Sequence, residues 1–255
     1  MATAGTYGYL KNTPTHFPNG INNQLAYMTH GNDSEPNRVR NIYFSDDFTQ
    51  SLDIAASTPL NYTVTLVAGG GTGASIASTT GRGGLVLITN DNGTSSTYDI
   101  ASKSLFMNLG NNLTKNWSMS FNVALSDVIN TNFFAGLCIS SATPLSASDF
   151  IGFSKASGAA TCSLLTSKAS SSTTVGSMTL VAATAVTLGA RYRANAQDKG
   201  GQNVIEMLVN DQIVASTTVI TNLSTSNMGV NIFYGNTTAE NSTLTLDWIN
   251  VYSDR

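Results

Sequence analysis

The most constraining feature of the sequence is the run WSMSFNVAL, in which large apolar and small polar side chains alternate. Trp117, Met119, Phe121, Val123 and Leu125 share one parity of this run. Successive side chains of a β-strand point to opposite faces of the sheet, so a period of two is the pattern of a half-buried strand. The run therefore predicts a sheet that is packed on one face and wetted on the other.

Similar runs continue along the chain from Ile42 onward. VTLGARYR repeats the alternation, whereas FFAGLCIS and NVIEMLVN are apolar at both parities and should lie nearer the middle of a sheet. Further strands are predicted at YTVTLV, LVLIT, DFIGFS, GSMTLVA, QIVAS and MGVNIFY. Asn210-Asp211 should form a tight hairpin turn, because both residues tolerate positive φ angles. About a dozen strands at short spacing predict an all-β sandwich.

Composition supports an all-β fold. Charged residues make up 11% of the 255 residues, against about 25% in ordinary soluble domains. Without Glu, Lys and Arg in quantity, the chain lacks the residues that sustain helices. Sandwiches of this length commonly form one unit, so we expect a single domain over residues 42–255.

Residues 1–41 differ from the rest of the chain because they show no sustained period of either two or 3.6 residues. We expect an extended N-terminal arm, which either lies along its own domain or is held by neighbouring chains in an assembly. Large aromatic and arginine side chains are the types that anchor such contacts. The candidate partner-binding residues of the arm are Tyr7, Tyr9, Phe17, Tyr27, Arg38 and Arg40.

The charge and hydropathy of the sequence argue against several classes of partner. The net charge of −3 provides no basic field for nucleic acid, and no stretch approaches the roughly 20 apolar residues of a membrane span. The start MATAGTYGYLKN lacks the pattern of a secretory signal, so we expect synthesis in a cytoplasm. Cys138 and Cys162 lie in apolar runs and should be buried as small hydrophobes, with a disulfide the less favoured alternative.

No catalytic constellation is evident in the sequence. A retaining glycosidase needs two carboxylates about 5 Å apart, yet the three glutamates, Glu35, Glu206 and Glu240, have no local partner of the required spacing. The two histidines, His16 and His30, both lie in the arm, where a nucleophile relay would lack rigid support. We therefore expect no enzymatic activity and no catalytic residues.

Cofactor and metal sites are equally poorly supported. AGGGTGA lacks the Lys-Ser/Thr ending of a phosphate loop and opens no helix, so it predicts a flexible loop. Asp46 and Asp47 are adjacent carboxylates, which point to opposite faces of a strand and supply too few ligands for a hard cation. The sequence therefore predicts neither a cofactor nor a metal ion.

The order of the motifs resembles that of the concanavalin A-like (LamG-like) jelly-roll structural proteins of tailed-phage virions. HFPNGINN in the arm precedes YFSDDF, the Gly-rich stretch ending in GRGGLVLITN, MSFNVAL, FFAGL, DFIGF and a VND hairpin. The chain then closes on LTLDWINVYSDR. The match spans nearly the whole chain and depends on the number and order of the motifs, each of which is weak alone.

This resemblance implies a concanavalin A-like jelly-roll β-sandwich that returns its last strand beside its first. Leu244 and Leu246 should face the core, and the change of parity to Ile249 and Val251 indicates either a β-bulge or burial on both sides. The resemblance also implies a non-enzymatic virion structural protein that decorates or cements the capsid surface through its arm. Its partners would be the major capsid protein and copies of itself, as a trimer or dimer.

The alternative function is a carbohydrate-binding module of a tail fibre or host-adhesion protein, and weak glycan binding is also compatible with capsid decoration. Sugar sites commonly stack a ring on an exposed aromatic side chain. Trp117 and Trp248 both fall at parities that predict core-facing side chains, which argues against a lectin. The remaining aromatic candidates are Tyr192, Phe233, Tyr234 and Tyr252, with core packing the favoured role of most.

Overall fold

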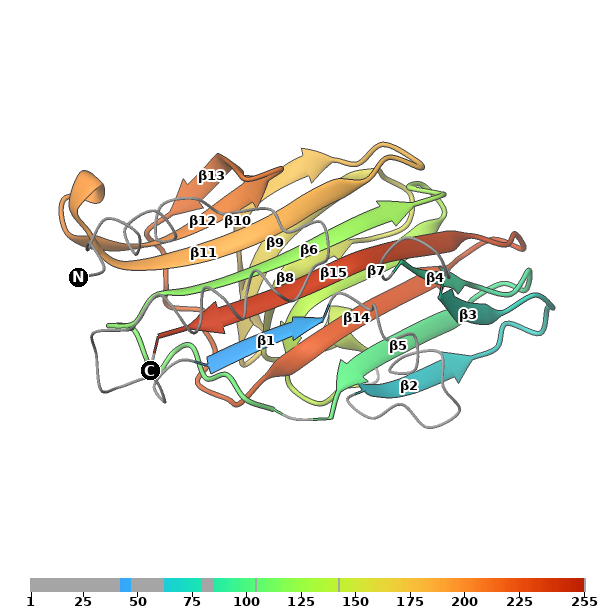
Figure 1. The fold of residues 1–255 in the computed structure, drawn as a ribbon, viewed down its shortest axis with the longest axis horizontal. Helices are drawn as coiled ribbons and strands as arrows, with labels where there is room; N and C mark the ends of the chain where they lie inside the picture. The colour runs from blue at the N-terminus through green and yellow to red at the C-terminus, as the bar shows by residue number, and fades with distance from the viewer. Residues whose placement is uncertain (1–41, 47–61, 79–84, 104, 142, 255) are drawn as a thin grey trace, which may run out of the picture.

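The computed structural model describes residues 42–46, 62–78, 85–103, 105–141 and 143–254. The predicted arm, residues 1–41, lies outside these residues, so its boundary with the domain stays a prediction. Within these residues, fifteen strands form two antiparallel sheets that pack face to face, and the predicted β-sandwich is confirmed (Figure 1). The described residues contain no helix that is long and apolar enough to span a membrane.

Sheet A has eight strands, in the order β13-β12-β11-β6-β15-β4-β3, with β1 also paired to β15. Its strands are β1 (Ile42–Asp46), β3 (Ser75–Ser78), β4 (Val86–Thr89), β6 (Trp117–Leu125), β11 (Val186–Ala196), β12 (Gln202–Val209), β13 (Gln212–Thr217) and β15 (Thr243–Ser253). Sheet B has seven strands, in the order β10-β9-β8-β7-β14-β5-β2. Its strands are β2 (Tyr62–Val67), β5 (Thr97–Ser102), β7 (Thr131–Cys138), β8 (Phe150–Lys155), β9 (Thr161–Lys168), β10 (Ser171–Thr179) and β14 (Gly229–Asn236).

The alternation of β6 places one row of side chains in the core between the sheets. Phe121 is completely buried, whereas the polar residues of the other parity are half-buried on the outer face of sheet A. Trp117 is buried and stacks on Tyr192 of β11. The core-facing prediction for Trp117 is therefore confirmed.

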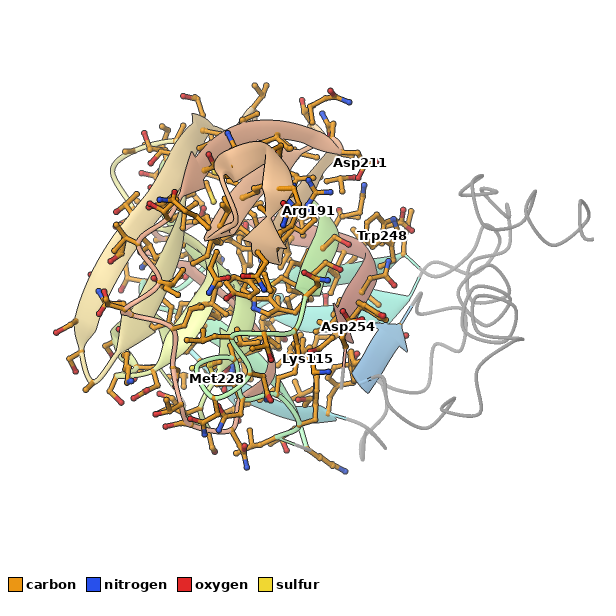
Figure 2. The ribbon with its side chains drawn as sticks, turned by 90° about the vertical axis from the view of Figure 1, so that its left-hand side faces the viewer. Lys115, Arg191, Asp211, Met228, Trp248 and Asp254 are labelled. Carbon is orange, nitrogen blue, oxygen red and sulfur yellow. The ribbon has the colours of Figure 1, made fainter. Side chains whose placement is uncertain are left out.

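β15 lies between β6 and β4 and also pairs with β1, so the last strand returns beside the first as expected. Its register on β6 shifts between Leu246 and Trp248, which makes Asp247 the extra residue of a β-bulge. Leu246 and Ile249 can thus both face the core, although they are three positions apart and would otherwise point to opposite faces. The same bulge turns Trp248 to the outer side of sheet A, where it is half-buried (Figure 2), so the core-facing prediction for Trp248 is wrong.

Two local predictions concern the turn between β12 and β13 and the two cysteines. Asn210 and Asp211 have φ angles of 48° and 64°, as the predicted primed turn requires. Cys138 and Cys162 are both free and buried, so their predicted burial is confirmed. Cys162 belongs to the main core, whereas Cys138 packs in a separate cluster on the outer face of sheet B.

The Gly-rich loop between β2 and β3 is tied to the β4–β5 turn by hydrogen bonds. The Asp91 carboxylate accepts hydrogen bonds from the backbone N–H groups of Gly69 at 2.8 Å and Gly93 at 2.9 Å. A Cβ atom on Gly71 would lie 2.1 Å from the backbone nitrogen of Gly93, so the close approach of the two loops requires glycine. A strand follows the loop instead of a helix, which is not the geometry of a phosphate loop.

Candidate functional site

The outer face of sheet B carries a polar site on β5 and its neighbour β14. Asp99 lies opposite Thr65 of β2 and Phe233 of β14, and Asn231 lies opposite Ala101 of β5. Residues of the same parity share a face, so Asp99 and Asn231 both point away from the core. Phe233 and Thr65 flank the carboxylate on the two adjacent strands.

Asp99 and Asn231 are joined by a buried hydrogen bond. The Asn231 amide Nδ2 donates to Asp99 Oδ1 at 2.8 Å, and the two residues are only 7% and 2% exposed. Burial raises the pKa of Asp99 above its ordinary value, and the hydrogen bond from Asn231 offsets this effect only in part. The carboxylate therefore occupies an environment that disfavours its charge.

The connection between β7 and β8 folds over part of the same face. Its residues Ile139, Leu145 and Ala147 pack against a second apolar cluster, which is separate from the core between the sheets. This cluster consists of Phe134, Cys138, Phe150 and Phe233. Asp149 accepts a hydrogen bond from the Ser224 hydroxyl at 2.6 Å, which ties the end of the connection to the segment before β14.

A cavity of about 360 Å³ opens between this connection and the edge strand β2 with its neighbour β5. Asp99 and Asn231 line it together with hydroxyl side chains from both sides, namely Thr63, Thr65, Ser102, Ser140 and Ser141. Leu105 and Ile139 add apolar surface to the lining, Lys103 adds an amine and Cys138 adds a thiol. Burial raises the pKa of the Cys138 thiol to about 12, so the thiol is neutral. These lining residues form the sheet-B cavity.

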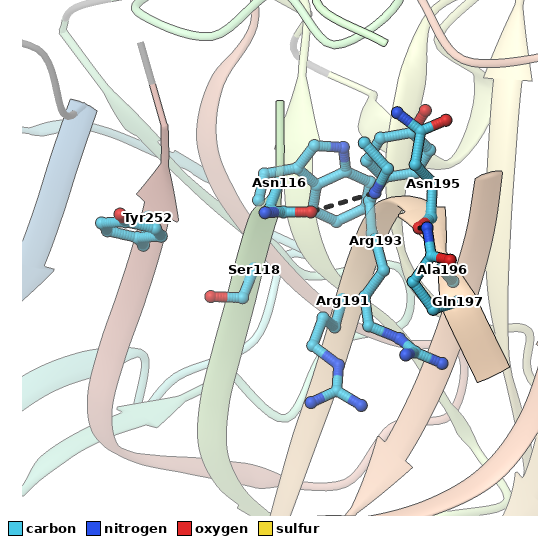
Figure 3. Close-up of a pocket in the computed structure, with 11 residues that line it drawn as sticks. Asn116, Ser118, Arg191, Arg193, Asn195, Ala196, Gln197 and Tyr252 are labelled. Carbon is cyan, nitrogen blue, oxygen red and sulfur yellow. Dashed lines mark hydrogen bonds between the residues drawn. The ribbon is translucent and has the colours of Figure 1, made fainter. Parts of the chain in front are cut away.

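A second and more open hollow of about 510 Å³ lies on the outer face of sheet A (Figure 3). Three of its side chains lie in cross-strand register, because Ser118 of β6 is opposite both Arg191 of β11 and Tyr252 of β15. Asn116 Oδ1 accepts a hydrogen bond from the backbone N–H of Ala194 at 3.0 Å, which fixes the end of the hollow (Figure 3).

The charged groups beside this hollow neutralise one another. Glu206 is 1% exposed, with Arg191 and Arg193 both at 2.6 Å from its carboxylate. Arg193 also forms a two-bond pair with Asp198. Burial alone would raise the pKa of Glu206, but the hydrogen bonds from Arg193 and Arg191 lower it below its ordinary value. Glu206 is thus held as an ionised structural group and is poorly suited to act as a general acid.

The remaining candidates from the sequence fall into two groups. Tyr7, Tyr9, Phe17, Tyr27, Arg38 and Arg40 lie outside the described residues, as do Glu35, His16, His30 and Asp47. Of the aromatic candidates, Tyr192 and Tyr234 are buried, Phe233 is 8% exposed in the apolar cluster, and Tyr252 is half-buried beside the sheet-A hollow.

Within the described residues, no group of three or more His, Cys, Asp or Glu side chains could hold a metal ion.

Sequence reasoning did not identify Asp99 or Asn231. The available signal was a polar residue inside an otherwise apolar strand, since Asp99 interrupts TYDIAS and Asn231 interrupts GVNIFY. Such residues are expensive to bury unless they are hydrogen-bonded, so they often mark a site. The pairing of the two strands, which brings the residues together, is visible only in the fold.

No protein-family model matches the sequence, and no curated protein matches it either. Among solved structures, the chain is similar to the carbohydrate recognition domain of Emp47p, with a TM-score of 0.54 and 9% identity over 80% of this chain and 94% of that one. It is also similar to arcelin-5, a lectin-like defense protein from Phaseolus vulgaris, with a TM-score of 0.54 and 8% identity over 85% and 100% of the two chains.

A third similar structure is SO2946 from Shewanella oneidensis MR-1, a protein of unknown function. The TM-score is 0.52 and the identity 15%, over 84% of this chain and 87% of that one. Identities this low show the fold alone. The fold is that of the concanavalin A-like jelly-roll sandwiches, as the sequence resemblance implied.

Proposed function

We propose that the sandwich is a non-enzymatic binding module that recognises a carbohydrate in the sheet-B cavity. The observation that carries this proposal is the Asp99–Asn231 pair, which stands at the base of a cavity walled by hydroxyl side chains. Ligand sites commonly enclose about 300–1,000 Å³ and hold a few fixed polar groups beside apolar surface. The cavity fits this description, and sugar hydroxyls suit both the carboxylate and the amide as partners.

The fold supports a recognition role without settling the ligand. Two of the similar structures are called a carbohydrate recognition domain and a lectin-like protein. Fold alone does not determine function, so the proposal depends on the cavity. Phe233 is too deeply buried to offer a stacking surface. Recognition would therefore depend on hydrogen bonds from the cavity walls more than on an aromatic platform.

A hydrolytic role is less well supported by the carboxylates of the described residues. Glu206 is neutralised by two arginines, and Glu240 is exposed in the loop before β15. Asp99 lies in the cavity, but its hydrogen-bonded neighbour is an amide and not a second carboxylate. A pair of carboxylates about 5 Å apart is the arrangement that a retaining glycosidase requires.

The test is binding of the full chain to a glycan array, followed by titration of the best ligand. We expect saturable binding that Thr65→Val and Asn231→Leu weaken at least tenfold, because each removes a polar partner from the cavity. Ser118→Ala, which alters only the sheet-A hollow, serves as the control and should leave affinity unchanged. Binding that is indifferent to the cavity variants would refute the assignment of the site.

We further propose that the module belongs to a tailed-phage virion and decorates the capsid surface. The support is the order of motifs from HFPNGINN to LTLDWINVYSDR, which resembles that of virion structural proteins. In this proposal residues 1–41 attach the protein to the major capsid protein, and contacts between copies, as dimers or trimers, reinforce the attachment. The chain would be made in the cytoplasm of the host.

This proposal is tested by co-sedimentation with capsid shells stripped of decoration. The full chain should bind saturably, and a chain that begins at residue 42 should not. The first outcome would identify the arm as the anchor. Absence of binding by either chain would contradict capsid decoration and direct the search to tail components.

A further inference from the structure

The base of the sheet-B cavity presents hydrogen-bond acceptors without matching donors. Asp99 accepts one hydrogen bond, from Asn231 Nδ2 at 2.8 Å. Asn231 Oδ1 is buried and has no hydrogen-bond partner among the described residues. An unpaired buried acceptor costs stability. Both residues line the cavity, so a ligand bound there could supply the missing donors.

Apart from Thr65, the positions opposite Asp99 and Asn231 cannot supply such a donor from their side chains. On the adjacent strands Asn231 lies opposite Ala101 and Gly136, and Cys138 lies opposite Gly229. These small residues leave space above the pair without adding polar groups. Thr65, opposite Asp99, contributes a hydroxyl that can donate or accept.

The charges that face the carboxylate also favour a cationic partner. β2 and β14 contribute no titratable side chain to the cavity lining, and β7 contributes the neutral thiol of Cys138. Asp149, at the end of the β7–β8 connection, adds negative charge on this side of the sheet, as its effect on the Cys138 thiol indicates. Lys103 lines the cavity, but burial still raises the pKa of Asp99, so the lysine does not compensate the carboxylate.

We propose that the ligand of the sheet-B cavity carries a primary ammonium group on a polyhydroxylated ring, as an unacetylated amino sugar does, and that this group binds between Asp99 and Asn231. The inference rests on the carbohydrate-binding function proposed above and specifies its ligand class. An ammonium offers three donors and a positive charge, whereas a hydroxyl or an acetamide N–H offers one donor and no charge. Only the ammonium satisfies both acceptors and neutralises the carboxylate together.

Selectivity for the amine is the measurable consequence. Charge-assisted hydrogen bonds contribute more than neutral ones by an amount that corresponds to roughly a 10- to 100-fold difference in affinity. Binding of the ammonium requires the ionised carboxylate, so affinity should fall as the pH is lowered through the pKa of Asp99. Neutral sugars, which do not need the charge, should show no such dependence.

The experiment measures the affinity of the full chain for glucosamine, glucose, N-acetylglucosamine and ethanolamine, at a pH below the pKa of the sugar amine. Asp99→Asn keeps the shape of the side chain and removes its charge. Asp211→Asn makes the same chemical change in the exposed β12–β13 turn, where asparagine also tolerates the positive φ of 64°. A thermal melt of each variant confirms that it is folded.

Glucosamine should bind at least tenfold more tightly than glucose and N-acetylglucosamine, and Asp99→Asn should reduce this preference to about twofold or less while Asp211→Asn preserves it. Equal binding of all three sugars would overturn the inference and leave the carbohydrate-binding function intact. Binding of ethanolamine with no preference for any sugar would support the ammonium site and contradict the carbohydrate function. Binding of no ligand would overturn both.

Discussion

Replacing the Asp99 carboxylate by an amide should stabilise the protein. The carboxylate is 7% exposed and has one hydrogen bond, from Asn231. Asparagine at position 99 keeps an acceptor for that bond and adds an N–H donor next to Asn231, whose Oδ1 otherwise has no partner among the described residues. Satisfying this acceptor is worth about 1–3 kcal/mol, and the loss of a charge-assisted bond costs about 1 kcal/mol. We expect a net gain of up to about 2 kcal/mol.

The pH dependence of this gain distinguishes the mechanism from a general improvement in packing. Burial raises the pKa of Asp99 in the folded state, so the native protein retains a proton that the unfolded chain releases at about pH 3.9. The wild-type protein therefore loses stability as the pH rises from the unfolded pKa through the folded pKa. Asp99→Asn lacks this loss. Its advantage should be complete above the folded pKa, shrink as the pH falls from there to the unfolded value of about 3.9, and be smallest below it.

The assay is urea unfolding of the wild-type protein and Asp99→Asn at neutral and acidic pH, with thermal unfolding as a second measure. A gain of about 2 kcal/mol corresponds to an increase in Tm of about 4–8 °C for a domain of this size. Asp211→Asn, in an exposed turn, should change stability by less than about 0.5 kcal/mol. Destabilisation by Asp99→Asn, or a gain that is the same at every pH, would refute the reasoning about the buried carboxylate.

Three further substitutions test other parts of the structure. Glu206→Gln should destabilise the protein by about 1–3 kcal/mol at neutral pH, which is less than for a fully buried pair because both arginines are partly exposed. The folded pKa of Glu206 is lowered, so urea unfolding should show this loss disappearing only as the pH falls below about 4.3. Phe121→Ala, at a completely buried core position, should lower stability by about 3–5 kcal/mol, and a loss under 1 kcal/mol in calorimetry would contradict the packing of β6 against the opposite sheet. Gly136→Ala should destabilise the protein by about 1–3 kcal/mol, because the new Cβ would lie 2.3 Å from the carbonyl oxygen of Ile151. An unchanged Tm would show that β7 and β8 are less closely paired than described.

Much of the fold was predictable because local patterns agree with the tertiary structure. The predicted strand WSMSFNVAL coincides with β6, and YTVTLV coincides with β2. The Asn210-Asp211 turn was predictable because its backbone angles select the residues that adopt them. The parity change in LTLDWINV correctly indicated a bulge in β15 as one of two alternatives.

The parts that escaped prediction depend on pairing between distant segments. β3, β5 and β9 were not predicted, since SIAS, TYDIAS and TCSLLTSK lack the large alternating apolar residues that mark a half-buried strand. The omission of β5 also concealed Asp99. Trp248 was assigned to the core from parity alone, because the effect of the bulge on its side chain requires the register with β6.

The buried carboxylates on the two outer faces of the sandwich lie in opposite environments, and this contrast supports the proposed site on sheet B. Glu206 on sheet A is neutralised by two arginines, so its charge contributes to structure and is already satisfied. Among the described residues, the one side chain that donates a hydrogen bond to Asp99 on sheet B is the Asn231 amide, whose own oxygen has no hydrogen-bond partner. A fold gains nothing from an uncompensated buried charge. A ligand that supplies donors and positive charge would remove the free-energy cost of burying the Asp99 carboxylate. The environment of Asp99 is therefore the one expected of a residue that binds such a ligand.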